Sequence, residues 1–234
     1  MRVLGIETSA QVGSVALLEI GGDGAETRVE ERSFEKGLRH GRDLVPTIDA
    51  LAHDWGLQPD AIDLFAVSQG PGSYTGIRVG VTCAKTLAYS LGKPVVGVPS
   101  LDVLASNAPR AGRVCAALDA KRKRVYFCTF RREDAELAAE APYRALPVAE
   151  AAAAVQPGDF VIGDALRLYA REFAARTAVL AEEALWLPHA AFVARLGARK
   201  LRLRGADDTF ALAPIYLHRP EAEEVWERKH GGEA

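Results

Sequence analysis

One glycine-rich stretch constrains the fold of this chain more than any other part of the sequence. Residues 68–80 read Ser-Gln-Gly-Pro-Gly-Ser-Tyr-Thr-Gly-Ile-Arg-Val-Gly, after a short apolar run at 62–67 and before an amphipathic segment that ends near Gly92. In α/β proteins, a strand, a glycine-rich turn and a helix in this order commonly hold a ligand at the helix N-terminus. The residues of the turn that form a candidate site are Gly70, Gly72, Ser73, Thr75, Gly76 and Arg78.

The spacing of these glycines excludes the common loops of this kind. A Walker loop has two glycines five residues apart, followed by Lys and Ser or Thr, and Gly70, Gly72 and Gly76 do not provide that pattern. The dinucleotide fingerprint requires glycine where Thr75 stands. The hydrolase elbow Gly-x-Ser-x-Gly fails at the same position. The turn is therefore distinctive without naming a reaction by itself.

The composition indicates a globular protein of one large domain or two small ones. The chain has 234 residues, 49% of them hydrophobic, and its 29 basic and 31 acidic side chains give a net charge of −2. This balance argues against a stand-alone nucleic-acid binder, which usually carries a basic excess. No signal peptide or membrane-spanning run is visible, and the three cysteines lack a metal-binding spacing. We therefore expect a cytoplasmic protein.

The first half of the sequence predicts three strands followed by helices and strands. Strands are expected at 3–6, 13–18 and 27–34, as an antiparallel meander that begins a mixed sheet. Apolar residues at helical spacing predict helices over 44–55 and 77–91, with Pro46 confined to a first turn. A strand at 95–98 is followed by a helix through residue 105, for which Ser100 is the expected N-cap.

The second half repeats this order, which predicts a duplicated α/β fold rather than a doubly wound Rossmann sheet. Apolar runs at 114–118 and 125–130 form a hairpin, with a short strand at 160–162 and helices expected at 149–155, 168–176 and 189–203. The cluster of Pro and Gly at 107–112 is the expected boundary. We therefore divide the chain into an N-terminal part, 1–106, a C-terminal part, 107–212, and an extended tail, 213–234.

With this turn and this order of elements, the chain resembles the TsaB family, also called YeaZ, of bacterial proteins needed to make threonylcarbamoyladenosine in tRNA. The glycine-rich turn is close to diagnostic, and weaker matching pieces follow in the family's order over nearly the whole chain. These pieces are Gly5–Ser9, Arg39-His40, Leu44–Pro46, Ala84-Lys85, Pro94, Gly97-Val98, Ser100-Leu101, Asp119-Ala120, Val125-Tyr126 and Pro214–Leu217.

The resemblance implies a fold, a function and partners. The fold would be the ASKHA architecture of actin, sugar kinases and Hsp70, with two related βββαβα halves. The main partner would be the paralogue TsaD, which transfers a threonylcarbamoyl group to the adenosine beside the anticodon of tRNAs that read codons beginning with A. The ATPase TsaE and a threonylcarbamoyl-adenylate synthase complete the pathway. A homodimer is expected in the absence of TsaD, and tRNA would be contacted indirectly, through the complex.

The residues argue against an independent catalytic site. TsaD carries His-x-x-x-His after the corresponding strand, a spacing that places two metal ligands on one helix face. Ser100 and Leu104 occupy those positions here, and leucine cannot bind a metal. The five histidines show no ligand spacing, so no metal is expected. No Ser, His and Asp set can be assembled from sequence order either, so a glycoprotease-like peptidase is the weakest alternative.

A nucleotide-dependent phosphotransferase or ATPase of the same fold is the stronger alternative. Such proteins wrap phosphates with two glycine-rich hairpin turns, because glycine lets the backbone approach closely. The first turn keeps Glu7, Thr8 and Ser9 but has one glycine, and the second keeps Asp119 but has none, with four cations at 121–124. We interpret Glu7, Thr8, Ser9 and Asp119 as a vestigial nucleotide site. No cofactor is expected for the chain alone, while ATP or ADP at the interface of a complex stays open.

Two further patterns have structural interpretations. Counting outward from the ends of the second turn places Cys115 opposite Cys128, and buried free thiols are expected there. The basic clusters at 121–124 and 195–204 are interpreted as solvated faces, with tRNA contact as the alternative.

If catalytic groups are absent, the function lies in binding. The helices expected over 44–55 and 77–91 each carry small or apolar residues beside the stripe that covers the sheet, and these could form a second apolar surface. The alternative is that these residues merely complete the core. The candidate partner interface comprises Val45, Ala52, Val79, Cys83 and Thr86.

Overall fold

Two mixed β-sheets form the centre of the computed structural model of this chain, which describes residues 1–34, 40–133, 136–175 and 177–217. The first sheet has the order β3-β2-β1-β4-β5, with β1, β2 and β3 antiparallel and β4 and β5 parallel to β1. Its strands are β1 (Arg2–Glu7), β2 (Gly13–Ile20), β3 (Glu26–Phe34), β4 (Leu64–Ser68) and β5 (Val95–Val98).

The second sheet repeats this topology. Strands β6 and β7 form an antiparallel hairpin, β8 and β9 pair with β7, and β10 and β11 continue parallel to β6. The strands are β6 (Gly112–Asp119), β7 (Arg124–Glu133), β8 (Glu136–Ala139), β9 (Arg144–Pro147), β10 (Phe160–Ile162) and β11 (Val179–Leu180). The correspondence of β6, β7, β10 and β11 to β1, β2, β4 and β5 confirms the predicted α/β fold of two related halves.

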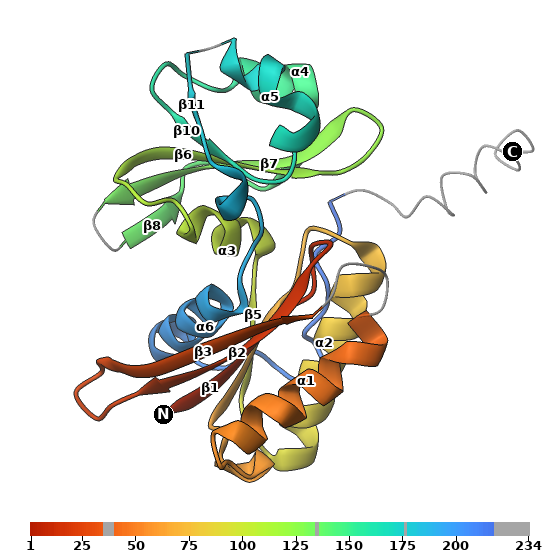
Figure 1. Cartoon of the computed structure of the whole chain (residues 1–234), viewed down its shortest axis with the longest axis vertical. Coiled ribbons are helices and arrows are strands. Elements are labelled where there is room, and N and C mark those ends of the chain that lie inside the picture. The colour runs from red at the N-terminus through yellow and green to blue at the C-terminus, as the bar shows by residue number, and fades with distance from the viewer. Residues whose placement is uncertain (35–39, 134–135, 176, 218–234) are drawn as a thin grey trace, which may run out of the picture.

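The helices also occupy equivalent places in the two halves, one before and one after the first parallel strand and a third at the end (Figure 1). They are α1 (His40–Asp54), α2 (Tyr74–Leu91), α3 (Ser100–Ser106), α4 (Val148–Ala153), α5 (Leu166–Ala174) and α6 (Ala190–Arg204), with short 3₁₀ turns at Pro59–Ala61 and Glu183–Leu185. None of the helices in these described ranges is long and apolar enough to cross a membrane.

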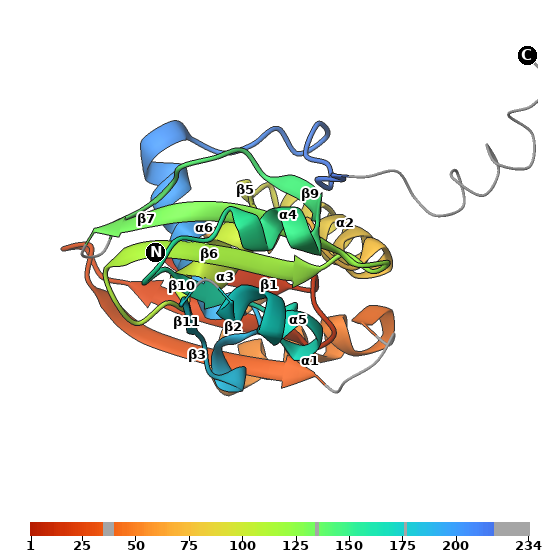
Figure 2. The ribbon, with the colours of Figure 1, turned by 90° about the horizontal axis from the view of Figure 1, so that it is seen from above.

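The two halves exchange their last helices. Helix α3 contributes Leu101, Leu104 and Ala105 to the core of the second sheet, whereas α6 packs Val193 and Ala194 against the first sheet. Both helices lie between the sheets, while α1 and α2 cover the outer face of the first sheet and α4 and α5 that of the second (Figures 1 and 2). The sequence division had grouped the α6 residues with the second part, 107–212; the boundary at 107–112 itself stays a prediction.

Strands β1, β2, β4, β5 and β10 are buried on both faces, which explains their nearly continuous apolar sequences. Along β1, Leu4 and Ile6 pack under α1 and α2, whereas Val3 packs under α6. Because side chains alternate across a strand, one short run supplies two separate cores. Gly92, with a left-handed backbone (φ 64°), ends α2 where the sequence predicted.

Two local predictions are wrong. Helix α1 begins at His40, so Pro46 lies in its second turn rather than its first. The Arg42 carbonyl that Pro46 cannot satisfy belongs to an exposed residue, where water can replace the missing donor. Ser100 is the first residue of α3 rather than its N-cap, which is Pro99, because the Ser100 hydroxyl bonds to Ser68 Oγ at 2.7 Å. The part of the predicted tail at 218–234 lies outside the described residues.

Glu31 attaches α6 to the first sheet. From β3, its carboxylate accepts the backbone N–H groups of Ala190 and Ala191, at 3.2 Å each, and contacts His189 Nδ1 at 3.1 Å. A carboxylate at a helix N-terminus satisfies free N–H donors and is favoured by the helix dipole. Burial alone would raise the pKa of Glu31. The hydrogen bonds from His189 and Ser14 have the opposite and larger effect, so the pKa of Glu31 is lowered from its usual value.

We expect Glu31→Gln to lower the free energy of unfolding by about 1–3 kcal/mol, because charged hydrogen bonds to the first turn of α6 are lost. The measurement is urea unfolding. The matched control is Glu26→Gln, which breaks the more exposed pair with Arg195 on the same strand and helix, and should cost under about 1 kcal/mol. Equal losses in the two variants would contradict the assigned role of Glu31.

The same contact predicts a pH dependence. The hydrogen bond that His189 donates to the Glu31 carboxylate raises the pKa of His189 above its usual value of 6.5. A raised pKa means that protonated His189 stabilises the fold fully below pH 6.5, and that this stabilisation is lost as pH rises through the folded-state value. The difference in unfolding free energy between the wild type and His189→Gln should therefore be larger at pH 5.5 than at pH 8.5. A difference independent of pH would contradict this assignment.

Candidate functional site

The glycine-rich turn lies directly against the turn between β1 and β2. Ser73 caps α2 by accepting the Gly76 N–H at 3.2 Å, and its own N–H donates to the Ser9 carbonyl at 2.7 Å. In return, Thr8 Oγ1 donates to the Gly76 carbonyl at 2.8 Å. These bonds hold the start of α2 on the end of β1.

Two glycines make this approach possible. A Cβ at Gly72 would overlap the Ser9 carbonyl oxygen, and a Cβ at Gly76 would overlap the Thr8 carbonyl oxygen. Both neighbours are backbone atoms that cannot rotate away. The glycines of the turn therefore serve contact between two parts of the chain, and the space in front of them is filled by Thr8 and Ser9.

Glu7 is fully buried beneath this contact. It accepts the Ser9 N–H through Oε1 at 2.5 Å, while Oε2 has no hydrogen-bond partner among the described residues. Burial raises the pKa of Glu7 above its usual value, and bonding with Ser9 and Ser68 opposes that shift only in part. A carboxyl group without access to solvent is poorly placed to contact a ligand's phosphates.

Asp119 belongs to the second turn and bonds within it. Its carboxylate accepts the Lys121 N–H at 2.9 Å and pairs with Lys121 Nζ at 2.5 Å. Residues 121–123 all adopt left-handed backbone conformations, φ 51° to 64°, without being glycine. The second turn therefore has no glycine-lined surface that could surround a phosphate. In the first turn, Thr8 and Ser9 fill the space in front of the glycines. The residues of this chain alone do not fit a nucleotide whose phosphates are enclosed by the two turns.

The positions where the resemblance places metal ligands have other contacts. Ser100 pairs with Ser68, and Leu104 is fully buried in the core of the second half. Within the described ranges, no group of three His, Cys, Asp or Glu side chains is arranged to hold a metal.

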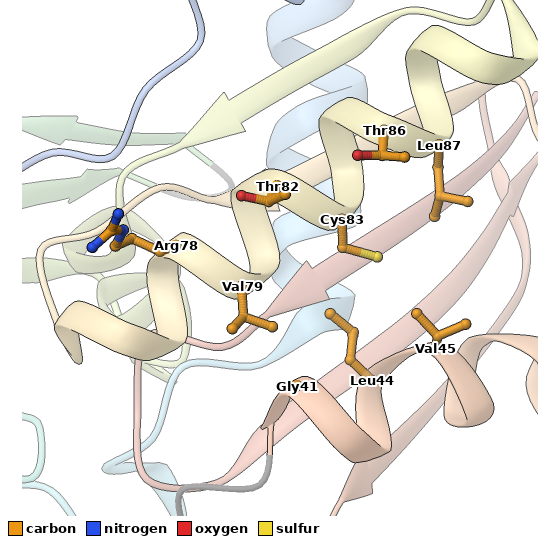
Figure 3. A pocket seen from close by; sticks show the side chains of 9 residues that line it. All are labelled: Gly41, Leu44, Val45, Arg78, Val79, Thr82, Cys83, Thr86 and Leu87. Carbon is orange, nitrogen blue, oxygen red and sulfur yellow. The ribbon is translucent and has the colours of Figure 1, made fainter.

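A groove of about 470 Å³ runs between α1 and α2 (Figure 3). Four of the five predicted interface residues line it: Val45 from α1, and Val79, Cys83 and Thr86 from α2. The Val45 side chain is 58% exposed, an unusual state for valine on a helix that also has a fully buried face. The groove is completed by Gly41, Leu44, Arg78, Thr82 and Leu87.

Ala52, the fifth predicted interface residue, is buried and does not line the groove. It lies two turns after Val45 on the same helix face, but the chain folds back there, and the Leu57 N–H donates to the Ala52 carbonyl at 2.9 Å. The sequence analysis missed Leu44, Thr82 and Leu87. Thr82 and Leu87 neighbour the predicted row on α2, so a wider helical stripe at the spacing i, i+4, i+8 could have included them.

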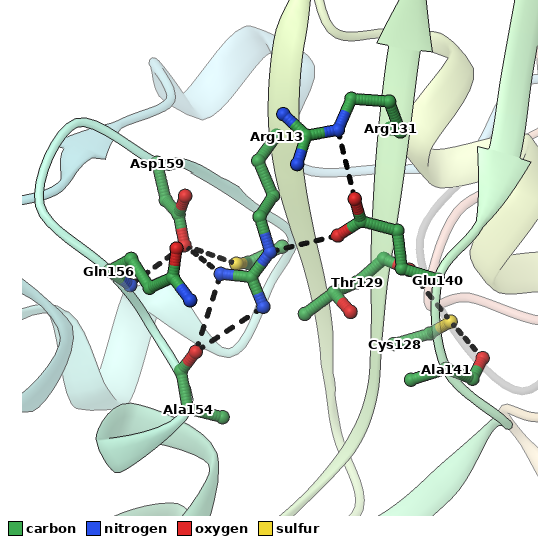
Figure 4. Close-up of polar contacts among 10 residues, drawn as sticks. Arg113, Cys128, Thr129, Arg131, Glu140, Ala141, Ala154, Gln156 and Asp159 are labelled. Carbon is green, nitrogen blue, oxygen red and sulfur yellow. Dashed lines mark hydrogen bonds and ion pairs between the residues drawn. The ribbon is translucent and has the colours of Figure 1, made fainter.

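The cysteines are free, and Cys115 and Cys128 are not opposite one another as predicted. Cys115 pairs with Thr129 in the β6–β7 register, because the tight turn begins at Ala120 and shifts the count by one. Adjacent register positions point to opposite sheet faces. Cys115 contacts Asp159 at 3.3 Å, within an ion-pair network of Arg113, Asp159 and Glu140, whereas Cys128 bonds the Ala141 carbonyl (Figure 4). Burial raises the pKa of Cys128 to about 12.

Three of the five cations in the predicted basic cluster at 195–204 form ion pairs within the chain. On α6, Arg195 pairs with Glu26, Arg199 with Glu136, and Lys200 with Asp207, at 2.8–2.9 Å. These partners support the solvated-face interpretation of the cluster, because neutralised cations are less available to phosphates.

We expect Gly76→Ala to lower the free energy of unfolding by about 1–3 kcal/mol or more, because the new Cβ overlaps the Thr8 carbonyl. Gly41→Ala is the matched helical control: nothing lies within 4 Å of its Cβ, so it should stabilise by about 0.5–1 kcal/mol. Thermal and urea unfolding would measure both. A neutral Gly76→Ala would contradict the close approach of the two turns.

Comparisons with known proteins agree with this geometry. The family model described as TsaD, tRNA N6-adenosine threonylcarbamoyltransferase, matches residues 36–226. A Bacillus subtilis tRNA threonylcarbamoyladenosine biosynthesis protein TsaB is 30% identical, over 97% of this chain and 98% of that protein. An Escherichia coli protein of the same name is 33% identical, over 57% of each chain. A solved structure, YeaZ from Pseudomonas aeruginosa, superposes with a TM-score of 0.81 at 28% identity, over 92% of this chain and 99% of that one.

The match to the Bacillus protein extends over almost the full length of both chains, and the YeaZ structure has the same overall fold. The chain therefore belongs to the TsaB family of tRNA threonylcarbamoyladenosine biosynthesis proteins.

Proposed function

We propose that this chain is a non-catalytic subunit that binds TsaD and holds it in an active arrangement. TsaD would transfer the threonylcarbamoyl group to the adenosine beside the anticodon, with TsaE as a further component. The observation that carries the proposal is the groove between α1 and α2, in which Val45 is exposed and Val79 and Cys83 are half-buried.

The groove has the chemistry of a helix-pair interface. Val45, Val79 and Cys83 present apolar surface, while Thr82 and Thr86 provide small hydroxyl side chains that let a second helix come close. A matching helix pair on TsaD would bury area in the range of a standard specific interface, about 1,200–2,000 Å². In the absence of TsaD, the same surface would pair with a second copy of this chain, as an isologous dimer.

The structure of the two turns at Glu7–Ser9 and Asp119–Arg124 favours a non-catalytic role for this chain. Thr8 and Ser9 fill the space before the glycine-rich turn, and Glu7 is sealed beneath it. Any ATP or ADP would then depend on groups that TsaD contributes at the junction, and tRNA would be contacted through the complex. No observation favours an independent ATPase or a peptidase.

We expect Val79→Arg to weaken binding to TsaD by about tenfold or more, equivalent to about 1.4 kcal/mol, because a charge would be buried without a partner. Cys83→Arg should behave alike. The control is Leu168→Arg on α5, a comparably large change at a residue that is 61% exposed and remote from the groove. Calorimetry or biolayer interferometry with TsaD measures the affinity.

Activity provides the second measurement. The wild-type chain alone should form no modified nucleoside, and should restore its synthesis when added to TsaD, TsaE, threonylcarbamoyl-adenylate and tRNA. Val79→Arg should restore less at limiting concentration, whereas Leu168→Arg should match the wild type. Unchanged TsaD affinity in both groove variants would refute the placement of the interface. Nucleoside synthesis by the chain alone would refute the non-catalytic role.

A further inference from the structure

We propose that a short unpaired stretch of RNA binds directly to this chain on the side chains of Tyr89 and Phe210, a surface separate from the groove. Bases would stack on the two rings, and phosphates would contact Lys93, Arg202 and Arg204. This inference goes beyond the proposed function, in which tRNA is contacted only through the complex, and it does not depend on the groove. Three observations carry it: two exposed aromatic side chains, a loop that fixes one of them in place, and cations that lack ion-pair partners.

The aromatic pair is unusually exposed. Among the described residues, Phe210 and Tyr89 have the two most exposed aromatic side chains, at 76% and 67%. Their ring centroids lie 5.4 Å apart in an edge-on arrangement, so the contact between them leaves most of each side chain open to water. Neither residue lines the groove. Aromatic side chains usually stabilise a fold by being buried, and a pair that stays exposed therefore indicates a binding surface.

The loop that carries Phe210 is held in place by several hydrogen bonds. Asp208 Oδ1 accepts the backbone N–H groups of Phe210 and Ala211 at 2.7 and 2.8 Å, and Lys85 Nζ donates to the Phe210 carbonyl at 3.0 Å. Two residues later, Leu212 is buried in the core under α2. The loop thus buries one apolar side chain and holds the other outward. A ring fixed in this way loses little conformational entropy when a ligand stacks on it.

The ends of α2 and α6 are brought together next to this loop. The Asp207 N–H donates to the Val95 carbonyl at 2.9 Å, and Lys200 Nζ pairs with Asp207 at 2.8 Å. Lys200 Nζ also donates to the Gly97 carbonyl at 3.0 Å. These contacts hold the chain after α6 against β5, the strand that follows α2. Charged side chains at both helix ends therefore lie at the same end of the first half as the aromatic pair.

This end of the molecule carries an excess of positive charge. Residues 85–93 and 200–210 contain five cations and two aspartates. Within the part of the chain that the structure describes, Lys93, Arg202 and Arg204 form no ion pair, and the two arginines are exposed. Cations that are not neutralised by the protein are free to attract phosphates, at an affinity that falls with salt.

This combination fits unpaired nucleotides better than a duplex or a protein. The bases of a single strand stack on aromatic rings with little regard to sequence, while the phosphates follow a basic surface. In a duplex the base faces are already stacked on one another, so the rings would have no partner. Two aromatic side chains supply only about 150–250 Å² each, well below the roughly 1,200–2,000 Å² of a standard protein interface.

Such a contact would matter most inside a complex. The chain has a net charge of −2, so its own affinity for RNA would be low. An RNA already held elsewhere in a complex would meet this surface at a high effective concentration, and a weak contact would then add to the total affinity.

The experiment measures the fluorescence anisotropy of a labelled oligouridine of about 12 nucleotides with the purified chain, at about 50 mM salt. Phe210→Ala and Tyr89→Ala each remove one ring, whereas Phe210→Tyr keeps a ring. The matched control is Leu203→Ala, because Leu203 is 69% exposed and lies between two of the cations but has no ring. Thermal unfolding verifies that each variant is folded.

We expect Phe210→Ala and Tyr89→Ala each to raise the Kd about fivefold or more, the loss typical of one stacked base, and Phe210→Tyr and Leu203→Ala to change it less than about twofold. Equal losses in Leu203→Ala and Phe210→Ala would overturn the proposal, since the surface would then be a general apolar one. Equal affinity for an RNA duplex of the same length, or no binding of the single strand at about 1 mM chain, would also overturn it.

Salt dependence tests the phosphate contacts separately from stacking. Arg204→Gln and Lys93→Gln should each reduce the slope of log Kd against log salt by about 0.7, whereas Phe210→Ala should leave the slope unchanged. The control is Arg171→Gln, an exposed cation on α5 that also lacks an ion pair among the described residues. Unchanged slopes in both cation variants would overturn the proposal. Failure of Val79→Arg to weaken TsaD binding would refute the proposed function and leave these RNA measurements standing.

Discussion

The close contact between the β1–β2 turn and the start of α2 determines the geometry of the first half. Glycines at 72 and 76 remove the side chains that would separate the two backbones, and hydrogen bonds from Thr8 and Ser73 close the gap. This contact fixes where α2 leaves the first sheet, and hence the angle at which it meets α1. One contact therefore both fills the space in front of the glycine-rich turn and sets where α2 begins beside α1.

Much of the fold was predictable because its signals are local. Strands buried on both faces appear as continuous apolar runs, and β10 (Phe160–Ile162) and β5 (Val95–Val98) begin and end where the sequence indicated. Strands β8 and β9 were missed because most of their residues are exposed or half-buried and form no continuous apolar run, and β11 because it has only two residues. The exchange of α3 and α6 was missed for another reason. An amphipathic pattern shows that one face of a helix is buried, but not which of two sheets covers it.

The candidate site was predictable to the extent that it depends on one helix. Val79, Cys83 and Thr86, which were predicted to belong to a partner interface, form a row on α2 that lines the groove. Ala52 was assigned wrongly to an exposed surface because its burial depends on how the chain turns after α1, which helical spacing does not report. The predicted pairing of Cys115 with Cys128 was wrong by one residue for a similar reason, because the length of the β6–β7 turn determines the register of the two strands. Glu7 and Asp119, for which a vestigial nucleotide site stays a prediction, each accept a hydrogen bond from within their own turn.

The exchanged helices restrict how such a protein can be divided. A polypeptide ending at residue 106 would keep the first sheet but lack α6, leaving the face that carries Val3, Leu64 and Val96 open to water. The complementary piece would lose α3 and with it Leu101 and Leu104. Neither fragment is a self-sufficient folding unit in spite of the visible internal symmetry. The internal symmetry therefore does not mark a place where the chain could be cut into two independently stable parts.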